Sequence, residues 1–192
     1  MRKVQRSELL DLGAYEAIRE RFRNRMIAAK RPRRVELGDH MSVVFENHDT
    51  ILLQVQEMLR TERISDEKGI AHELETYNEL IPEGRMLSAT HFIEYDDEVE
   101  RRRMLQQLHG VRERVHLVIG EERFTARFAV HHGEEMDRIP AVNYLSFEIG
   151  DRAAALRDAG LAVSLEVDHP LYEVRVELGT ATRRALADDL ED

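Results

Sequence analysis

The sequence predicts a single α+β domain over residues 1–192, with an antiparallel or mixed sheet and helices packed mainly on one side of it. The length suits one domain with one substantial core. Apolar residues recur at steps of three and four before residue 82, which indicates helices, and alternate with polar residues in much of the later chain. Short turns join the later segments, as in antiparallel sheets.

The first half of the chain shows helical spacing. One apolar stripe predicts a helix over residues 14–30 within the basic N-terminal segment 1–34, with an interruption at Gly13. The stripe consists of Tyr15, Ile18, Phe22 and Met26. A helical hairpin, which includes a helical N-terminus near Ser65, should follow over about residues 48–82. We therefore expect the helices to be concentrated near the N-terminus.

The second half, residues 88–179, reads mainly as strands. Residues 115–119 and 123–128 flank Gly120-Glu121-Glu122 and should form a hairpin. In its second strand, Phe124, Ala126 and Phe128 alternate with Arg123, Thr125 and Arg127, so the two sets should lie on opposite faces. A C-terminal helix over residues 180–191 should end the fold.

Composition and charge limit the classes of function. The chain has no cysteine, which excludes disulfides and thiolate-held metal or iron–sulfur sites and suggests a cytoplasmic protein. It has no long apolar segment, so we expect no membrane association. The net charge is −10, yet residues 1–34 hold eleven Lys and Arg against four Asp and Glu. A basic helix could bind nucleic acid, but the acidic remainder would repel it, so a helix facing water or its own acidic body is the simpler interpretation.

The segment Glu46-Asn47-His48-Asp49-Thr50 marks a change from strand to helix. Adjacent His and Asp can both bind a metal, but further histidines would be needed on neighbouring helices. Asp49 or Asn47 can instead serve as the N-cap of the following helix, where an acidic group also complements the helix dipole. We expect Asp49 to act as the cap.

A polar pocket could form where the strand before this segment meets the helical hairpin. Its candidate residues are His40, Glu46, Glu57, Glu73, Tyr77 and Asn78. A divalent metal is a second possibility, with Glu57, His72, Glu73 and His40 as candidate ligands. No Glu-x-x-His motif is present on the hairpin, however, and a solvated charged face accounts equally well for these residues. We identify no cofactor motif.

Two other histidine segments have simpler explanations. His131 and His132 lie in a loop with Glu134 and Glu135, where exposed pairs can bind metals without a biological role. Asp168-His169-Pro170 should form a turn, because Pro fixes the backbone and Asp can hydrogen-bond to it.

The segments ENHDTILLQVQEMLRTERI, HELETYNELIP and LSATHFIE resemble a bacterial family known as domain of unknown function 3501. The resemblance also covers RSELLDLGAYEAIR, RRVELGDHMSVVFEN, AVNYLSFEI and VDHPLYE, and so runs along nearly the whole chain. Members of this family have no established activity. They are often encoded beside a rubrerythrin-like di-iron protein and an iron–sulfur protein, which implies an accessory role in redox chemistry with these proteins as partners.

Three functional hypotheses remain from the sequence. The first is a cytoplasmic accessory protein that binds a redox partner. The second is a ligand- or metal-binding domain, or a hydrolytic or redox enzyme, that uses the carboxylate and histidine pocket. The third is a nucleic-acid binder that uses the basic N-terminal helix. The oligomeric state is left open.

Overall fold

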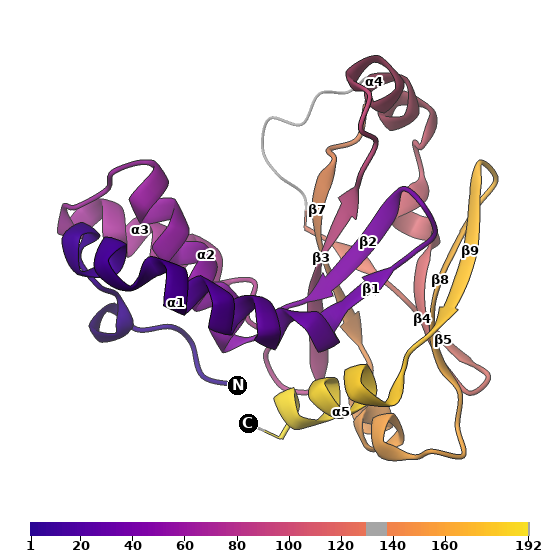
Figure 1. The fold of residues 1–192 in the computed structure, drawn as a ribbon. Helices are drawn as coiled ribbons and strands as arrows, with labels where there is room; N and C mark the ends of the chain where they lie inside the picture. The colour runs from indigo at the N-terminus through magenta and orange to yellow at the C-terminus, as the bar shows by residue number, and fades with distance from the viewer. Residues whose placement is uncertain (130–137, 192) are drawn as a thin grey trace.

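The computed structural model describes residues 1–129 and 138–191, and it confirms the α+β class (Figure 1). The α-helices are α1 (Leu12–Lys30), α2 (His48–Thr61), α3 (Glu67–Asn78), α4 (Glu98–Gln107) and α5 (Thr180–Asp189). Short 3-10 helices are η1 (Arg6–Glu8), η2 (Arg31–Arg33), η3 (Val111–Arg114) and η4 (Gly150–Arg157). No helix in the described part of the chain has the length and apolar character needed to cross a membrane.

The strands divide between two antiparallel sheets rather than forming one. The first has the order β1 (Arg34–Glu36), β2 (Met41–Phe45), β3 (Met86–Ile93), β7 (Val142–Glu148) and β6 (Arg127–Phe128). The second has the order β5 (Glu122–Thr125), β4 (Val115–Ile119), β8 (Val163–His169) and β9 (Tyr172–Glu177). The chain passes from the second sheet to the first at Ala126, between β5 and β6.

The inner faces of the two sheets enclose the larger hydrophobic core. Val43 and Phe45 from β2 belong to the same buried cluster as Leu117 from β4 and Leu165 from β8. Leu186 of α5 also joins this core. The alternation of side chains along each strand places every second residue in this core, which is the period-two pattern expected for a half-buried strand.

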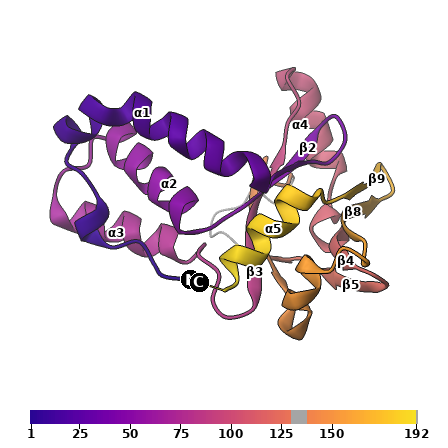
Figure 2. The ribbon, with the colours of Figure 1, turned by 60° about the horizontal axis from the view of Figure 1, so that its bottom comes forward.

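The N-terminal helices form a second hydrophobic core at one side of the sheets (Figure 1). Ile51, Val55 and Leu59 of α2 pack with Ile70 of α3, and Val4 from the N-terminal segment joins them. Apolar residues at steps of three and four therefore bury one face of α2, as the sequence pattern predicted. Figures 1 and 2 both show the two chain termini close together, near the junction between the helices and the sheets.

Helix α1 differs from the sequence prediction at its start. The Asp11 side chain accepts a hydrogen bond from the Ala14 amide at 2.8 Å, so the helix begins at Leu12 and contains Gly13 in its first turn. The predicted interruption at Gly13 is wrong, because this N-cap offsets the low helix propensity of glycine. Tyr15 and Met26 are the fully buried residues of the helix.

The β1–β2 turn is held to the second sheet by Tyr172. Its hydroxyl donates to the Leu37 carbonyl at 2.5 Å and accepts from the His40 amide at 3.0 Å. Gly38, in this turn, has a φ of +72°, and a Cβ there would lie 2.8 Å from the Tyr172 hydroxyl. The contact therefore requires glycine for two separate reasons: backbone conformation and space.

Candidate functional site

The strand-to-helix segment after β2 forms a capped junction. The Asn47 side-chain oxygen accepts from the Thr50 amide at 3.0 Å, and the Thr50 hydroxyl accepts from the Asn47 amide at 2.8 Å. Asn47, one of the two residues predicted as possible caps, is therefore the N-cap, and Asp49 is not. Helix α2 begins two residues earlier than an Asp49 cap would require, so Asp49 lies in its first turn, where its charge still complements the helix dipole.

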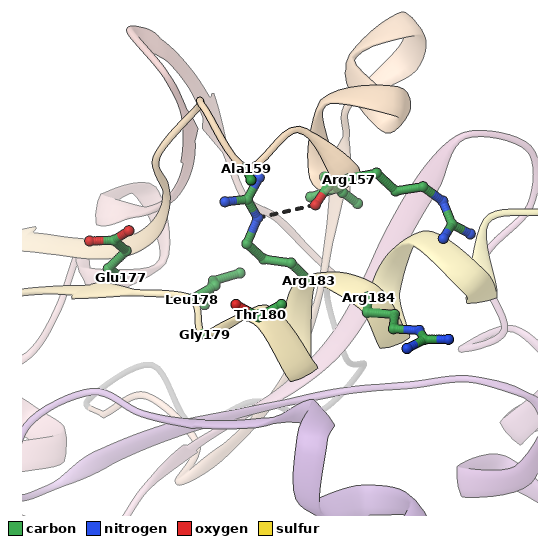
Figure 3. A pocket seen from close by; sticks show the side chains of 9 residues that line it. Arg157, Ala159, Glu177, Leu178, Gly179, Thr180, Arg183 and Arg184 are labelled. Atoms are coloured by element: carbon green, nitrogen blue, oxygen red, sulfur yellow. Dashed lines mark hydrogen bonds between the residues drawn. The ribbon is translucent and has the colours of Figure 1, made fainter.

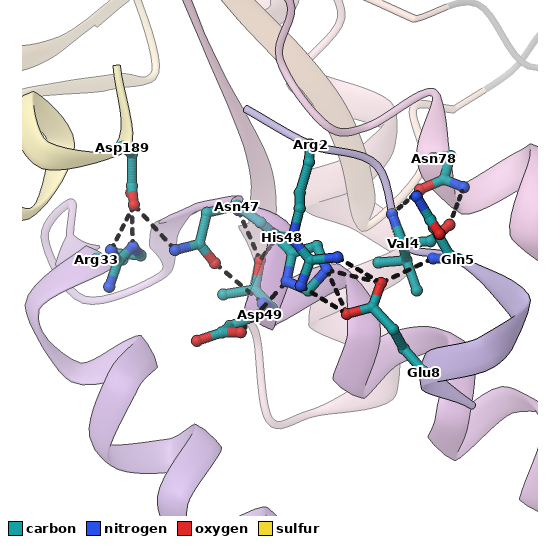
Figure 4. A network of polar contacts seen from close by, with 11 residues as sticks. Arg2, Val4, Gln5, Glu8, Arg33, Asn47, His48, Asp49, Asn78 and Asp189 are labelled. Atoms are coloured by element: carbon teal, nitrogen blue, oxygen red, sulfur yellow. Dashed lines mark hydrogen bonds and ion pairs between the residues drawn. The ribbon is translucent and has the colours of Figure 1, made fainter. Parts of the chain in front are cut away.

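A nearly buried ion pair between Arg33 and Asp189 accepts a further hydrogen bond from Asn47 and so joins α1, α2 and α5 (Figure 4). Arg33 donates two hydrogen bonds to Asp189 of α5, at 2.8 and 2.7 Å, and a third to the Ala29 carbonyl of α1 at 2.8 Å. The Asn47 amide group donates to Asp189 at 3.0 Å. The side chains of Arg33 and Asp189 are only 12% and 10% exposed, so the charges depend on each other for compensation.

His48 ties the N-terminal segment to the start of α2 (Figure 4). Its Nε2 atom lies 3.1 Å from the Glu8 carboxylate, and its Nδ1 atom lies 3.4 Å from Asp49. Burial opposes ionisation of Glu8, but hydrogen bonds from Arg2, the Gln5 amide and His48 outweigh it and lower the pKa of Glu8 to about 2. A polar cleft of about 310 Å³ adjoins this network, whose groups are already paired with one another.

Glu46 lies buried beneath α2 with one oxygen atom unpaired. The residue is only 3% exposed. One carboxylate oxygen accepts from the Thr90 hydroxyl at 2.6 Å and from the Gln54 amide group at 3.0 Å. The other oxygen has no hydrogen-bond partner among the described residues. A buried unpaired oxygen reduces stability, which makes Glu46 the strongest of the pocket residues predicted from the sequence.

Tyr144 connects Glu46 with Tyr77 electrostatically. Burial, and next the charge of Glu46, raise the pKa of Tyr144. Burial, and next Tyr144, raise the pKa of Tyr77 to about 12. Tyr144 and Ser88 also line an open groove of about 520 Å³ on the helix-facing side of the first sheet. Two predicted pocket residues, Glu46 and Tyr77, therefore both interact electrostatically with Tyr144.

Glu57 faces α1. Its carboxylate accepts from the Tyr15 hydroxyl at 2.5 Å and from Arg19 at 2.9 and 2.8 Å. The Arg19 hydrogen bond lowers the pKa of Glu57, although burial opposes this effect. Burial, and next the bond to Glu57, raise the pKa of Tyr15. Glu57 thus holds α1 on α2 through a partly buried ion pair.

The remaining candidates occupy separate places. Asn78 exchanges two hydrogen bonds with the backbone of Val4, at 2.8 and 2.9 Å. The His40 ring stacks on Tyr95 with ring centroids 4.0 Å apart, in the turn before β2. His72 and Glu73 lie on α3, where His72 is exposed. In residues 1–129 and 138–191, no group of three or more His, Asp and Glu side chains is arranged so that it could hold a metal ion.

Two other sequence predictions concern the histidine loops. The loop with His131 and His132 lies outside the described residues. The prediction of a turn at Asp168-His169-Pro170 is wrong in its position, because β8 continues through His169. Asp168 bonds to His116 and Arg123 across the sheet instead of to its own backbone.

His91 is a buried group that the sequence analysis did not single out. It is fully buried on β3, and neither ring nitrogen has a hydrogen-bond partner in the described part of the chain. The Phe128 ring meets it edge-on at 6.2 Å. Burial lowers the pKa of His91 to about 4. The alternation of Leu87, Ala89, His91 and Ile93 was the signal that could have placed this imidazole on the inner face.

The surface of α1 carries a basic and partly apolar face, here called the outer face of α1. It consists of Ile18, Arg21, Arg25, Ile27 and Arg31 at the start of η2, all of them exposed. Ile18 and Ile27 are 43% and 57% exposed. The three arginines have no ion-pair partner among residues 1–129 and 138–191. Arg25 lies over the Phe22 ring, 5.4 Å from its centroid, so this face presents exposed cations that make no ion pair within the described residues, together with apolar side chains.

A cavity of about 510 Å³ lies at the start of α5, where three arginines line it (Figure 3). Arg183 donates to backbone carbonyl groups, including those of Leu156 at 3.1 Å and Leu161 at 2.8 Å. Arg157 forms ion pairs with Asp188 and Glu191. Two of the three cations are therefore engaged in holding η4 and α5 together.

Comparison with known proteins supports the same fold. Residues 3–190 match the model of a family described as "Protein of unknown function (DUF3501)". A crystal structure of a novel protein of unknown function from Burkholderia pseudomallei K96243 has a TM-score of 0.90 and 37% sequence identity. The match covers 98% of this chain and 100% of that chain. No curated protein sequence matches this one.

We predict that Arg33→Ala lowers the free energy of unfolding by about 3–5 kcal/mol, because it leaves the buried Asp189 carboxylate without a counter-ion. Urea denaturation at neutral pH measures this loss. The double variant Arg33→Met/Asp189→Leu removes both charges and should recover most of the stability. Equal losses in the single and double variants would show that the ion pair is not the source of the effect.

Because the buried His91 imidazole resists protonation, we predict that the protein loses stability in acid. The unfolded chain binds a proton at His91 below a pH of about 6.5, whereas the folded chain resists it until about pH 4, so folding should lose about 3 kcal/mol between these values. In His91→Leu this part of the pH dependence should disappear. Urea midpoints between pH 7.5 and pH 4.5 measure it, with the exposed His72→Leu as matched control. Parallel pH curves for wild type and His91→Leu would contradict the prediction.

Proposed function

We propose that this chain, which belongs to the DUF3501 family of proteins of unknown function, is a cytoplasmic accessory protein that binds a redox partner. The expected partners are a rubrerythrin-like di-iron protein and an iron–sulfur protein, as the family resemblance implies. The observation that supports this proposal most directly is the outer face of α1. The chain has no cysteine with which to hold an iron–sulfur cluster by thiolates, which favours a docking role over electron transfer through such a cluster.

The arginines of the outer face are available to a partner, unlike Arg19. Arg19 is engaged with Glu57, whereas Arg21 and Arg25 have no ion-pair partner in the described part of the chain. The exposed Ile18 and Ile27 add apolar area between and beside these charges. Apolar contacts surrounded by charges are typical of interfaces that form and dissociate.

The exposed arginines of this face favour a partner with an acidic protein surface. The chain as a whole carries −10, so attraction to an acidic partner has to come from a local positive region rather than from net charge. At physiological salt, charges act over roughly 8–10 Å, which lets the arginines orient a partner at close range. The rest of the chain is acidic and would repel a long polyanion such as DNA, because DNA bound to α1 would extend past this helix.

We predict that the double variant Arg21→Glu/Arg25→Glu weakens binding to the purified iron–sulfur or rubrerythrin-like partner about ten- to hundredfold, because it creates like-charge contacts. Isothermal titration calorimetry at low and physiological salt measures the change. The matched control is Arg102→Glu/Arg184→Glu, which alters net charge equally at exposed arginines on α4 and α5. Equal affinity in both double variants, or salt-sensitive binding to duplex DNA that the first one abolishes, would contradict the proposal.

A second candidate function is ligand binding beside Glu46, supported by its unpaired oxygen and by the neighbouring groove. A ligand with a hydrogen-bond donor or a positive charge would complement that oxygen. We expect a thermal-shift screen of small amines and divalent cations to find a stabilising ligand for wild type. Glu46→Gln should lose that response, and Glu75→Gln at an exposed position of α3 should keep it. A screen without any selective response would count against this function.

A further inference from the structure

A chain of three polar side chains crosses the outer face of the second sheet. The Thr125 hydroxyl on β5 lies 3.0 Å from His116 Nδ1 on β4, and His116 Nε2 lies 3.2 Å from Asp168 Oδ1 on β8. Thr125 and His116 are directly opposite each other in the strand register. The order is hydroxyl, imidazole and carboxylate, which is the order of groups that activates a nucleophile in hydrolases of several unrelated folds.

The partners of His116 determine where its proton lies. Ionised Asp168 can only accept hydrogen bonds, so His116 Nε2 carries the hydrogen and Nδ1 has the free lone pair. The Thr125 hydroxyl therefore donates to Nδ1. This arrangement directs the hydroxyl proton at the atom that would remove it when Thr125 attacks an electrophile.

Asp168 is fixed and kept ionised by two arginines. Arg123 donates to its second oxygen at 2.9 Å, and Arg114 lies 3.8 Å from its first. Burial would raise the pKa of Asp168, but His116, Arg123 and Arg114 together lower it. Asp168 thus acts on Thr125 through His116, as a positioning residue.

The nucleophile and its base differ in their exposure to solvent. The His116 side chain is 7% exposed, whereas Thr125 is an exposed residue. The hydroxyl can therefore meet a molecule from solution while its base remains shielded from bulk water. The Arg114 side chain is 53% exposed, so its remaining donors can bind a negative group on that molecule.

We propose that Thr125 and His116 form a hydrolytic site for activated acyl esters that carry an anionic group. This activity is independent of the partner-binding role. The Thr125 oxygen attacks the carbonyl carbon, its proton passes to His116 Nδ1, and the bond to the leaving oxygen breaks. The proton then goes to the leaving group, which departs as an alcohol. Water, deprotonated by His116, cleaves the Thr125 ester, releasing a carboxylic acid and regenerating the hydroxyl.

The test uses 4-nitrophenyl acetate and its anionic analogue 4-nitrophenyl hemisuccinate with the full chain. We expect release of nitrophenolate, faster for the hemisuccinate, and an acyl adduct on Thr125 in peptide mass spectra. Thr125→Val should remove the adduct and slow the reaction about tenfold or more, the order expected for losing a positioned nucleophile and base. Thr76→Val, at an exposed threonine on α3, should leave both unchanged.

Two further variants separate chemistry from folding. Thr125→Ser keeps a hydroxyl and should retain the adduct. Asp168→Asn should lower kcat with little change in KM, because an amide can donate to His116 Nε2 and so favour the tautomer that has no free lone pair on Nδ1. Far-UV circular dichroism checks that each variant is folded. The proposal is overturned if wild type forms no adduct on Thr125, or if Thr125→Val hydrolyses both esters at the wild-type rate. In that case the three residues serve only as a polar link between strands.

Discussion

The ion pair between Arg33 and Asp189 is the constraint on which the arrangement of this protein depends. The N-terminal helices and the two sheets have separate hydrophobic cores, so these two cores do not by themselves fix one against the other. Arg33 follows α1, Asp189 ends α5, and Asn47 caps α2 while bonding to the same carboxylate. Directional hydrogen bonds between nearly buried charges therefore determine how the helices are placed beside the sheets.

The same junction explains why polar side chains are buried between the two cores. Glu46, Gln54 and Thr90 bond to one another where α2 crosses the first sheet, in a region that neither core fills with apolar groups. Of the acidic and imidazole groups predicted to meet there, Glu46 lies at this junction, whereas His40 stacks on Tyr95 in the turn before β2 and His72 is exposed on α3. Glu57 is held by α1 instead, because Tyr15 and Arg19 satisfy its carboxylate.

Features that depend on periodicity could be predicted from the sequence. Helix starts and strand partners that depend on single contacts could not. The α+β class, the helical hairpin and the antiparallel strands follow from steps of three and four and from alternation. The division into two sheets depends on Ala126, where the chain changes partners, and no local pattern marks it. At Asp49 and Gly13 the competing caps Asn47 and Asp11 determined the helix start, and propensity alone could not rank them.

The polar chain from Thr125 to Asp168 shows the limit most clearly, because its members come from three strands whose register the sequence does not encode locally. The alternation around Phe124 correctly placed Thr125 on the outer face, but only the pairing of β4 with β5 and β8 brings His116 and Asp168 to it. This face lies on the far side of the molecule from α1 in both views (Figures 1 and 2). A partner bound to α1 would leave Thr125 accessible, so partner binding and ester hydrolysis are compatible in a single chain.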